Sequence, residues 1–298
     1  MEKSMSKYLP RRKFISWSLR GLAAAVVGKG YYNTTPGELT LSRVDIRLPG
    51  LPAAFHGARI AHFTDLHASW IVDADLYRRA VALAMQERPD WVVLTGDFIT
   101  GATKFLSDSV GSFDRQYLDN SIAALAGLQA PLGIYGVLGN HDFWSGPAAV
   151  AAITQAYSEA LGVRWLRNSH VRLEKNGAAI ELLGVDDYWE TSSSLYDACK
   201  GLDEQSVRIL LSHNPDINEE IDVLGKRIDL VLSGHTHGGQ VVLPLAGQPV
   251  MPSKFGQKYR AGLVQDGARQ TYVSRGIGHL LFPMRFNCPP EVAIIRLS

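Results

Sequence analysis

Cysteine is scarce in this sequence: 298 residues include only two, Cys199 and Cys288. They lie far apart and form no Cys-x-x-Cys pair, which argues against a metal site built on thiolates. A disulfide between them requires an oxidising compartment. Without one, both cysteines behave as small apolar residues of the core, which is the outcome that we expect.

Long apolar runs and a strong net charge are also absent. The uncharged run at 21–28 is far too short to span a bilayer of about 30 Å. The net charge is +1, but the first 29 residues hold seven bases and one acid, which leaves 23 bases and 28 acids for the rest. An acidic body without a basic, aromatic-rich patch excludes a general attraction to nucleic acid. It is compatible with a fold that holds cations.

The N-terminal segment has the organisation of an export signal. Residues 10–28 read PRRKFISWSLRGLAAAVVG, a basic stretch followed by a weakly apolar one. Arg11-Arg12 resembles the twin-arginine motif, although Pro10 and Ser16 depart from its usual pattern and no clean cleavage site follows. We expect residues 1–38 to be a twin-arginine-type signal or anchor and a linker. The export machinery would then place the protein in the periplasm or on the outer face of the cytoplasmic membrane; the alternative is a disordered basic tail.

The body, residues 39–298, is 260 residues of alternating strand-like and helix-like patterns, which predicts one α/β domain. Helical patterns cover 73–87, 147–161 and 215–224. A hairpin is expected around Asn176-Gly177. Strand patterns cover 39–48, 58–65, 91–97, 133–142, 207–216, 228–237, 270–274 and 292–297. Open α/β sheets bind ligands at the carboxyl ends of their strands, so the residues that follow these strands are the first candidates for a site.

Polar clusters follow five of the predicted strands. They read DLH, GD, GNHD, SHNPD and GHTH, and they contain five of the nine histidines: His67, His141, His213, His235 and His237. Side chains two residues apart on an extended backbone point the same way, so Asp65 and His67 can bind one ion. Carboxylate, imidazole and amide groups suit Mn, Fe or Zn better than Ca or a single Mg. One carboxylate can bridge two ions about 3.5–4 Å apart, and two imidazoles one residue apart can each reach a different ion.

These blocks, D-x-H, GD, GNH, H and GHxH in this order, resemble the calcineurin-like metallophosphoesterase superfamily. The neighbouring SGHTHGGQ, HNPD, VLPLAG and RFNCPPEV resemble the bacterial exported phosphodiesterases of the YaeI/YkuE type. The resemblance implies a sandwich of two mixed β-sheets flanked by helices. It also implies a first ion held by Asp65, His67 and His237, a second ion held by Asn140, His213 and His235, a bridging Asp97, and a His141 that faces the substrate.

The function implied is a metal-dependent phosphodiesterase with two divalent ions per chain, Mn first and Fe or Zn as alternatives. A hydroxide bridging the two ions attacks a small-molecule or lipid-linked phosphodiester. Asp97 and His141 are the expected catalytic residues, and His141 stabilises the phosphoryl charge or donates a proton to the leaving oxygen. Asp142 either orients His141 or caps the following segment, and orientation is the role that we expect.

Two other functions stay open. One is hydrolysis of a lipid pyrophosphate of the UDP-2,3-diacylglucosamine type; its support is the apolar stretch 278–286, which we expect to be a buried loop and strand but which can also face acyl chains or a membrane. The other, from a different class, is an envelope binding protein with an inactive metal site, although no ligand is missing. We expect a monomer, with specificity set by loops 98–118 and 186–206. The charges of 252–260 are expected to be solvated rather than bound to phosphate.

Overall fold

The computed structural model describes residues 39–298 apart from 102–112, 191, 204, 245–246 and 281–283, together with positions 20, 21, 24, 25 and 28. The twin-arginine motif, the linker and most of the expected specificity loop 98–118 therefore lie outside the described residues. In the part of the chain that is described, no helix combines the length and the apolar character needed to cross a membrane.

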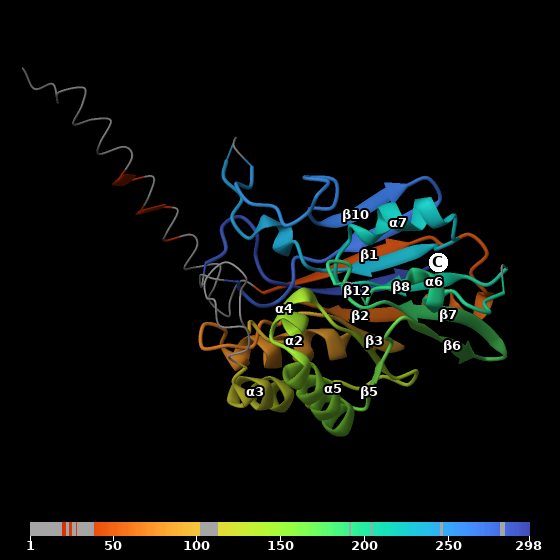
Figure 1. The fold of residues 1–298 in the computed structure, drawn as a ribbon, viewed down its shortest axis with the longest axis horizontal. Coiled ribbons are helices and arrows are strands. Elements are labelled where there is room, and N and C mark those ends of the chain that lie inside the picture. Colours follow the sequence, from red (N-terminus) through yellow and green to blue (C-terminus); the bar gives the residue numbers. More distant parts are fainter. Residues whose placement is uncertain are drawn as a thin grey trace, which may run out of the picture.

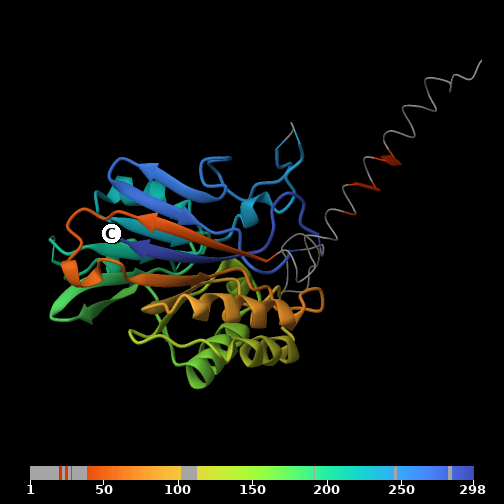
Figure 2. The ribbon, with the colours of Figure 1, turned by 180° about the vertical axis from the view of Figure 1, so that it is seen from behind.

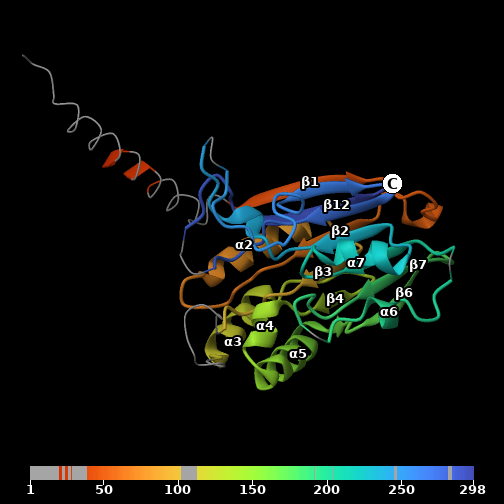
Figure 3. The same ribbon diagram turned by 45° about the horizontal axis from the view of Figure 1, so that its top comes forward.

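Two six-stranded mixed sheets form the centre of the fold. The first has the order β1-β12-β2-β3-β4-β5, in which only β12 and β2 pair antiparallel, and Figure 3 shows this order from β1 down to β4. Its strands are β1 (Thr40–Ile46), β2 (Arg59–Phe63), β3 (Trp91–Thr95), β4 (Ile134–Val137), β5 (Val163–Trp165) and β12 (Glu291–Leu297). The parallel run β2-β3-β4 brings the carboxyl ends of three strands to one edge.

The second sheet has the order β10-β11-β9-β8-β7-β6, with antiparallel pairs at both ends and parallel pairs between. Its strands are β6 (Ser169–Lys175), β7 (Ala178–Gly184), β8 (Arg208–Leu211), β9 (Leu230–Ser233), β10 (Gly262–Asp266) and β11 (Arg269–Val273). Strands β6 and β7 are the hairpin that Asn176-Gly177 predicts, and both turn residues have a positive φ.

Helices cover the outer faces of the two sheets. Figures 1 and 2 show α2 (Ala74–Gln86), α3 (Arg115–Leu125) and α5 (Pro147–Leu161) together on one side of the sandwich. On the opposite side, α6 (Leu195–Ala198) and α7 (Ile217–Leu224) pack on the second sheet. Short turns complete the chain: η2 (Ala53–Phe55), α4 (Asn140–Trp144) and η3 (His237–Gly239). The predicted arrangement of two mixed sheets flanked by helices is confirmed.

The central strand β3 shows why these residues form layers. All five of its side chains are buried, as expected for a strand covered on both faces. Trp91 and Val93 join the core between the sheets, while Val92 and Leu94 join the core beneath the helices. Alternation places successive side chains in different layers, so an apolar strand is stable here although it has no polar face.

Several parts of the fold were not predicted, among them helix α6, which lies in the expected loop 186–206. Helix α3, which begins after the cap Asp114, fell partly in an expected loop. Strands β5 and β10 lie at sheet edges and are short, so they have little periodic signal. The segment 133–142, expected to be a single strand, is β4 followed by α4, because Gly139 caps a helix whose first turn contains Asp142.

His62, on β2, gives the fold a pH dependence of its own. Its ring is buried, its Nε2 lies 2.7 Å from Thr95 Oγ1, and burial lowers its pKa to about 3. The unfolded chain takes up this proton below about pH 6.5 and the folded chain does not, so acid stabilises the unfolded state. The stability that the folded state owes to a neutral His62 is complete above pH 6.5 and is lost as the pH falls from about 6.5 to about 3.

We therefore expect His62→Gln, which keeps a hydrogen-bonding group beside Thr95, to flatten the acid side of the stability curve. Between pH 6 and 5, the free energy of unfolding of the unaltered protein should fall by about 1.2 kcal/mol more than that of the variant. Urea unfolding at several pH values measures both slopes. Parallel slopes would show that His62 already carries a proton in the folded state.

Candidate metal centre

The turns after five strands meet at one end of the sandwich and bring the predicted site residues together. Main-chain hydrogen bonds join these turns: His67 N–H donates to the Asp97 carbonyl (2.9 Å) and Gly234 N–H donates to the His213 carbonyl (3.0 Å). Asp65 is tied to the loop after β11, because Gly278 N–H donates to its carbonyl (2.7 Å). The positions of the side chains therefore depend on backbone that is fixed by both sheets.

Three groups of donor atoms result, and one of them, His67, Asp97 and His141, shares its first two members with the other two. Asp65, His67 and His237 have donor atoms within 4.8 Å of one another, and so do Asp97, His213 and His235. The shortest approach in the first group is 2.9 Å, between His67 Nε2 and His237 Nε2. In the second group, His235 Nδ1 lies 3.2 Å from His213 Nε2. These are the two groups that the resemblance assigns to two ions, apart from Asn140.

Asp97 lies between the two groups. Its Oδ2 is 3.4 Å from His67 Nε2 and 3.1 Å from His213 Nε2. Its Oδ1 accepts the backbone N–H of His141 at 2.9 Å. One oxygen is thus shared between the groups, while the other fixes the carboxylate to the first turn of α4.

The donor set suits divalent cations. All the residues of both groups are buried, and Asn140 Oδ1 and His235 Nε2 have no hydrogen-bond partner among the described residues. Buried acceptors without donors are unfavourable unless a cation or water satisfies them. Nitrogen and oxygen donors without thiolate fit Mn, Fe or Zn. The residues present therefore fit two divalent ions.

The protonation states of two of the imidazoles agree with this interpretation. Burial lowers the pKa of His67 to about 3 and holds that of His237 well below its ordinary value, so both rings are neutral ligands at pH 7. Burial would also lower the pKa of His213, but the carboxylates around it, Asp97 first, raise it to about 10. Burial would raise the pKa of Asp97, yet the positive charge on His213 holds it well below its usual range. Without metal, a proton on His213 supplies the positive charge that Asp97 requires.

The backbone at the ligands is unusual. Of ten described non-glycine residues with positive φ, five are predicted ligands: Asp65, His67, Asp97, His235 and His237. Asp65 and His67 were expected on extended backbone; their φ values of 50° and 48° are in the left-handed region instead. That region is uncommon for residues other than glycine, although asparagine, aspartate and histidine adopt it more often than other residues do. The backbone therefore turns sharply at each of these five residues, and this turn directs their side chains toward the centre.

Glycines permit the close packing of these turns. Gly96 has φ +90°, and a side-chain carbon placed on it would lie 2.6 Å from the Gly139 nitrogen. A carbon on Gly139 would lie 2.5 Å from the Asp97 nitrogen. The turns after β3 and β4 therefore touch backbone to backbone, and only glycine fits at the contact.

His141 lies beside the first group and belongs to neither of the two groups assigned to ions. Its Nδ1 is 2.8 Å from the Thr100 carbonyl, to which it donates, and its ring stands edge-on to His67 with centroids 5.0 Å apart. The contact to Thr100 fixes the ring and leaves Nε2 as the nitrogen available to a substrate.

Asp142 does not orient His141, so that expectation is wrong. Its carboxylate accepts backbone N–H groups of Asp97 (3.0 Å), Phe98 (2.9 Å) and Gly139 (2.9 Å). Backbone N–H groups at the start of a helix have no partner within the helix, and the Asp142 carboxylate accepts a hydrogen bond from that of Gly139. Asp142 therefore holds the turn that carries Asp97, and Thr100 performs the role expected of Asp142.

The sequence did not single out several residues that contact the ligands. Arg285 is fully buried, donates to the Gly278 carbonyl and has its Nη2 3.1 Å from His237 Nδ1. Trp189 stands edge-on to His235 with ring centroids 4.4 Å apart, and Trp144 lies 5.0 Å from His141. An arginine inside an apolar stretch was the one signal in the sequence for Arg285.

Other predictions concern residues outside the centre. Cys199 and Cys288 are both buried and unpaired. Segment 278–286 is largely buried where it is described, and 281–283 lie outside the described residues. Lys258, within the charged run 252–260, pairs with Glu219 (2.6 Å) and Asp266 (2.9 Å). The remaining histidines, His56, His62, His170 and His279, contribute to neither group of ligands.

Comparison with known proteins gives a consistent result. A family model described as calcineurin-like phosphoesterase matches residues 58–239, a range that contains every predicted ligand. The metallophosphoesterase YkuE of Bacillus subtilis is 29% identical over 298 residues, covering 98% of this chain and 99% of YkuE. Phosphodiesterase YaeI of Escherichia coli is 30% identical over 294 residues, covering 97% and 99%. UDP-2,3-diacylglucosamine pyrophosphatase LpxG of Chlamydia muridarum is 28% identical over 313 residues, covering 88% and 90%.

Proposed function

Because this chain belongs to the calcineurin-like phosphoesterase family and is a metallophosphoesterase, we propose that it hydrolyses a phosphodiester with two divalent ions bound at the strand ends. The observation that carries this proposal is the position of Asp97 Oδ2, 3.4 Å from His67 Nε2 and 3.1 Å from His213 Nε2. A single carboxylate oxygen between two sets of nitrogen donors is the arrangement that a shared ligand of two ions requires.

The first two groups described above would each bind one ion. Asp65, His67 and His237 would hold one ion, Asn140, His213 and His235 the other, and Asp97 both. Such a pair would activate a water molecule as the nucleophile near neutral pH and would neutralise charge on the phosphoryl oxygens. The nitrogen and oxygen donors favour Mn, with Fe and Zn as alternatives.

Side chains of the protein would position the substrate and transfer protons. His141, whose Nδ1 is held by the Thr100 carbonyl, presents Nε2 to the substrate and delivers a proton to the leaving oxygen. Burial lowers the pKa of the free ring. An anionic phosphodiester beside it favours the protonated form. Burial of the surrounding residues limits the access of water to the centre.

The test is hydrolysis of bis-p-nitrophenyl phosphate and of p-nitrophenyl phosphate by the full chain, with Mn, Fe, Zn or Mg added. We expect diester cleavage with Mn, and a kcat about 10²–10³-fold lower in His141→Ala, the loss usual for one group that stabilises transition-state charge. His56→Ala, a histidine that contacts only the Leu51 carbonyl, is the matched control. A strong monoester preference would favour a phosphatase, and no hydrolysis with any metal would favour the envelope binding protein.

A second candidate is hydrolysis of a lipid pyrophosphate. Its support is the similarity to LpxG, whose name gives UDP-2,3-diacylglucosamine as its substrate. The similarity to YaeI, a phosphodiesterase, spans more of this chain. Incubation of the metal-loaded protein with a diacylated sugar nucleotide in detergent distinguishes the two, because release of a nucleoside monophosphate is expected only for the pyrophosphate hydrolase.

We further propose export through a twin-arginine-type signal to the periplasm or the outer face of the cytoplasmic membrane. The support is Arg11-Arg12 within a basic segment that precedes an uncharged run. Replacing both arginines by lysine should retain the protein in the cytoplasm, as measured by fractionation. Equal amounts of variant and unaltered protein outside the cytoplasm would contradict the proposal.

A further inference from the structure

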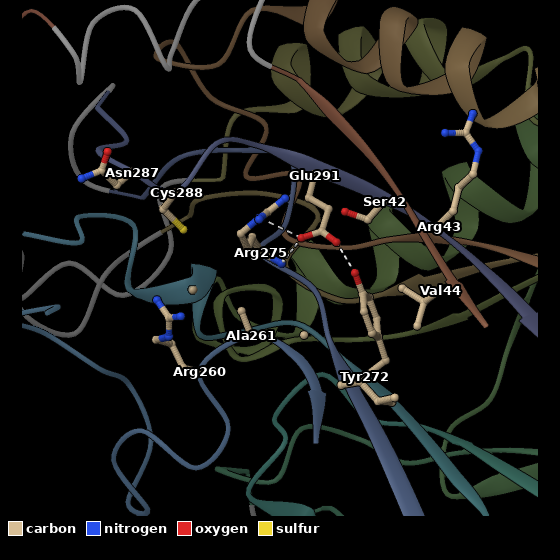
Figure 4. Close-up of a pocket in the computed structure, with 13 residues that line it drawn as sticks. Ser42, Arg43, Val44, Arg260, Ala261, Tyr272, Arg275, Asn287, Cys288 and Glu291 are labelled. Carbon is tan, nitrogen blue, oxygen red and sulfur yellow. Dashed lines mark hydrogen bonds and ion pairs between the residues drawn. The ribbon is translucent and has the colours of Figure 1, made fainter. Parts of the chain in front are cut away.

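A second cavity, outside the metal centre, lies where the edges of the two sheets meet. It has a volume of about 470 Å³ and is lined by residues of β1, the turn after His237, the start of β10, the end of β11 and the start of β12. Figure 4 shows Arg260 and Arg275 on the side of Asn287 and Cys288, with Arg43 at the other end beside a helix. The volume is within the range of pockets that bind small molecules.

The charges around this cavity do not cancel. Arg43 is paired with Glu87 (2.6 Å) and Arg275 with Glu291 (2.9 Å). Within the described part of the chain, Arg260 has no acidic partner. Residues 30–298 hold 23 bases and 28 acids and are therefore acidic overall. The surplus positive charge at this cavity is opposite in sign to the net charge of the rest of these residues. An uncompensated guanidinium at a cavity is a binding group for an anion.

Glu291, the one acid that lines the cavity, is already engaged. It accepts a hydrogen bond from the Tyr272 hydroxyl, and Arg275 pairs with its other oxygen. The ion pair cancels one charge of each sign and holds Arg275 in place, so Arg260 supplies the surplus positive charge of the cavity. Arginine offers two parallel N–H groups to a phosphate, and two arginines on one side of a cavity can contact different oxygens of the same phosphate.

Part of the cavity lining is apolar. It comprises Val44, Ala261, Leu263 and Tyr272, of which Figure 4 shows Val44 and Tyr272 away from Arg260, and Leu263 is 45% exposed. A ligand that fills the cavity thus carries an anionic group at one end and a carbon-rich group at the other. A phosphomonoester with an aromatic or hydrocarbon substituent has this distribution.

The cavity also adjoins the metal centre. Gly238 lines it directly after His237, and a side-chain carbon on Gly238 would lie 2.7 Å from Cys288 Sγ and 3.0 Å from Arg275 Cγ. Arg275 precedes Gly276, where such a carbon would lie 2.6 Å from Asp65 Cβ. The cavity wall therefore packs closely against the turns that carry His237 and Asp65.

We propose that this cavity binds a phosphomonoester, with its phosphate on Arg260 and Arg275 and its organic group on the Val44–Leu263 side. The choice of a monoester rests on the proposed function in one respect: water adds across one P–O bond of a phosphodiester and releases a phosphomonoester and an alcohol. The cavity would then bind the phosphomonoester product beside the turns that carry His237 and Asp65.

Calorimetric titration of the metal-loaded full chain with phenylphosphonate tests the proposal, because its P–C bond is not hydrolysed. We expect two binding events, one at the metals and one at the cavity. Arg260→Gln, a change at an exposed side chain, should weaken only the cavity event, by at least about tenfold, the loss expected for one charge-assisted contact. Arg296→Gln, at an exposed arginine paired with Asp45 outside the cavity, is the matched control.

Asp97→Asn separates this proposal from the proposed function, because it removes the shared metal ligand and leaves the cavity intact. The cavity event should persist in Asp97→Asn at unchanged affinity. A single binding event that disappears with Asp97→Asn, or an isotherm that Arg260→Gln does not alter, would overturn the proposal. Titration with inorganic phosphate in parallel measures the contribution of the organic group, and equal affinities would overturn the assignment of the apolar wall.

Discussion

Asp97→Asn is expected to lower kcat/KM for diester hydrolysis by roughly 10³–10⁴-fold, corresponding to the several kcal/mol of transition-state stabilisation that a metal pair supplies. The amide keeps an oxygen where Oδ1 accepts the His141 N–H, so the turn stays in place. It loses the negative charge at Oδ2, the atom that lies beside both His67 and His213. Loss of activity should therefore accompany loss of metal, without loss of fold.

Asp229→Asn is the matched control for this variant. Asp229 is also buried, but it lies at the opposite end of β9 from His235, where it accepts the Arg208 N–H at 2.8 Å. It should retain hydrolysis within about threefold, and metal analysis should find close to two ions per chain in the control and fewer in Asp97→Asn. More than a tenth of the original activity in Asp97→Asn would rule out a shared ligand at this position.

Removal of divalent ions should abolish hydrolysis and also destabilise the fold. In the proposed centre the ions bind where Asp65, Asp97 and the imidazoles converge, and the unfolded chain has no such site. A site saturated at about 100 times its Kd contributes about 2.7 kcal/mol. For a chain of this size that corresponds to roughly 5–10 °C in Tm per site.

Thermal unfolding followed by circular dichroism, with chelator and after addition of Mn, measures this effect. Asp97→Asn serves as the control, because a variant that binds less metal should show a smaller change in Tm. An identical Tm with and without metal, in a protein shown by metal analysis to be loaded, would contradict the assignment of the two groups as ligands.

The candidate site could be predicted because its chemistry is local in the sequence. Asp65 and His67, or His235 and His237, are neighbours on one turn, and the carboxyl ends of parallel strands lie at one edge of a sheet. The roles of Asp142 and Thr100 could not be predicted. They depend on which backbone groups the turn after β3 presents to α4, about 40 residues further along the chain.

The same distinction applies to the fold. A fully apolar strand such as β3 and the Asn-Gly hairpin of β6 and β7 are determined by their own residues. The three residues of β5 form a strand only because β4 offers an unpaired edge. Arg285 is a comparable case in the site: its burial follows from the carbonyl groups of the loop after β11, and its own flanking residues carry no information about them.

The left-handed backbone at five ligands makes stability and activity favour different amino acids at the same positions. Glycine at Asp65, His67, Asp97, His235 or His237 would relieve a conformational penalty of about 1 kcal/mol at each. It would also remove a metal ligand. Selection for heat resistance alone, in a metal-free medium, should therefore enrich inactive variants at these turns. Thermostabilisation of this enzyme requires either metal during selection or restriction of changes to the rest of the sandwich.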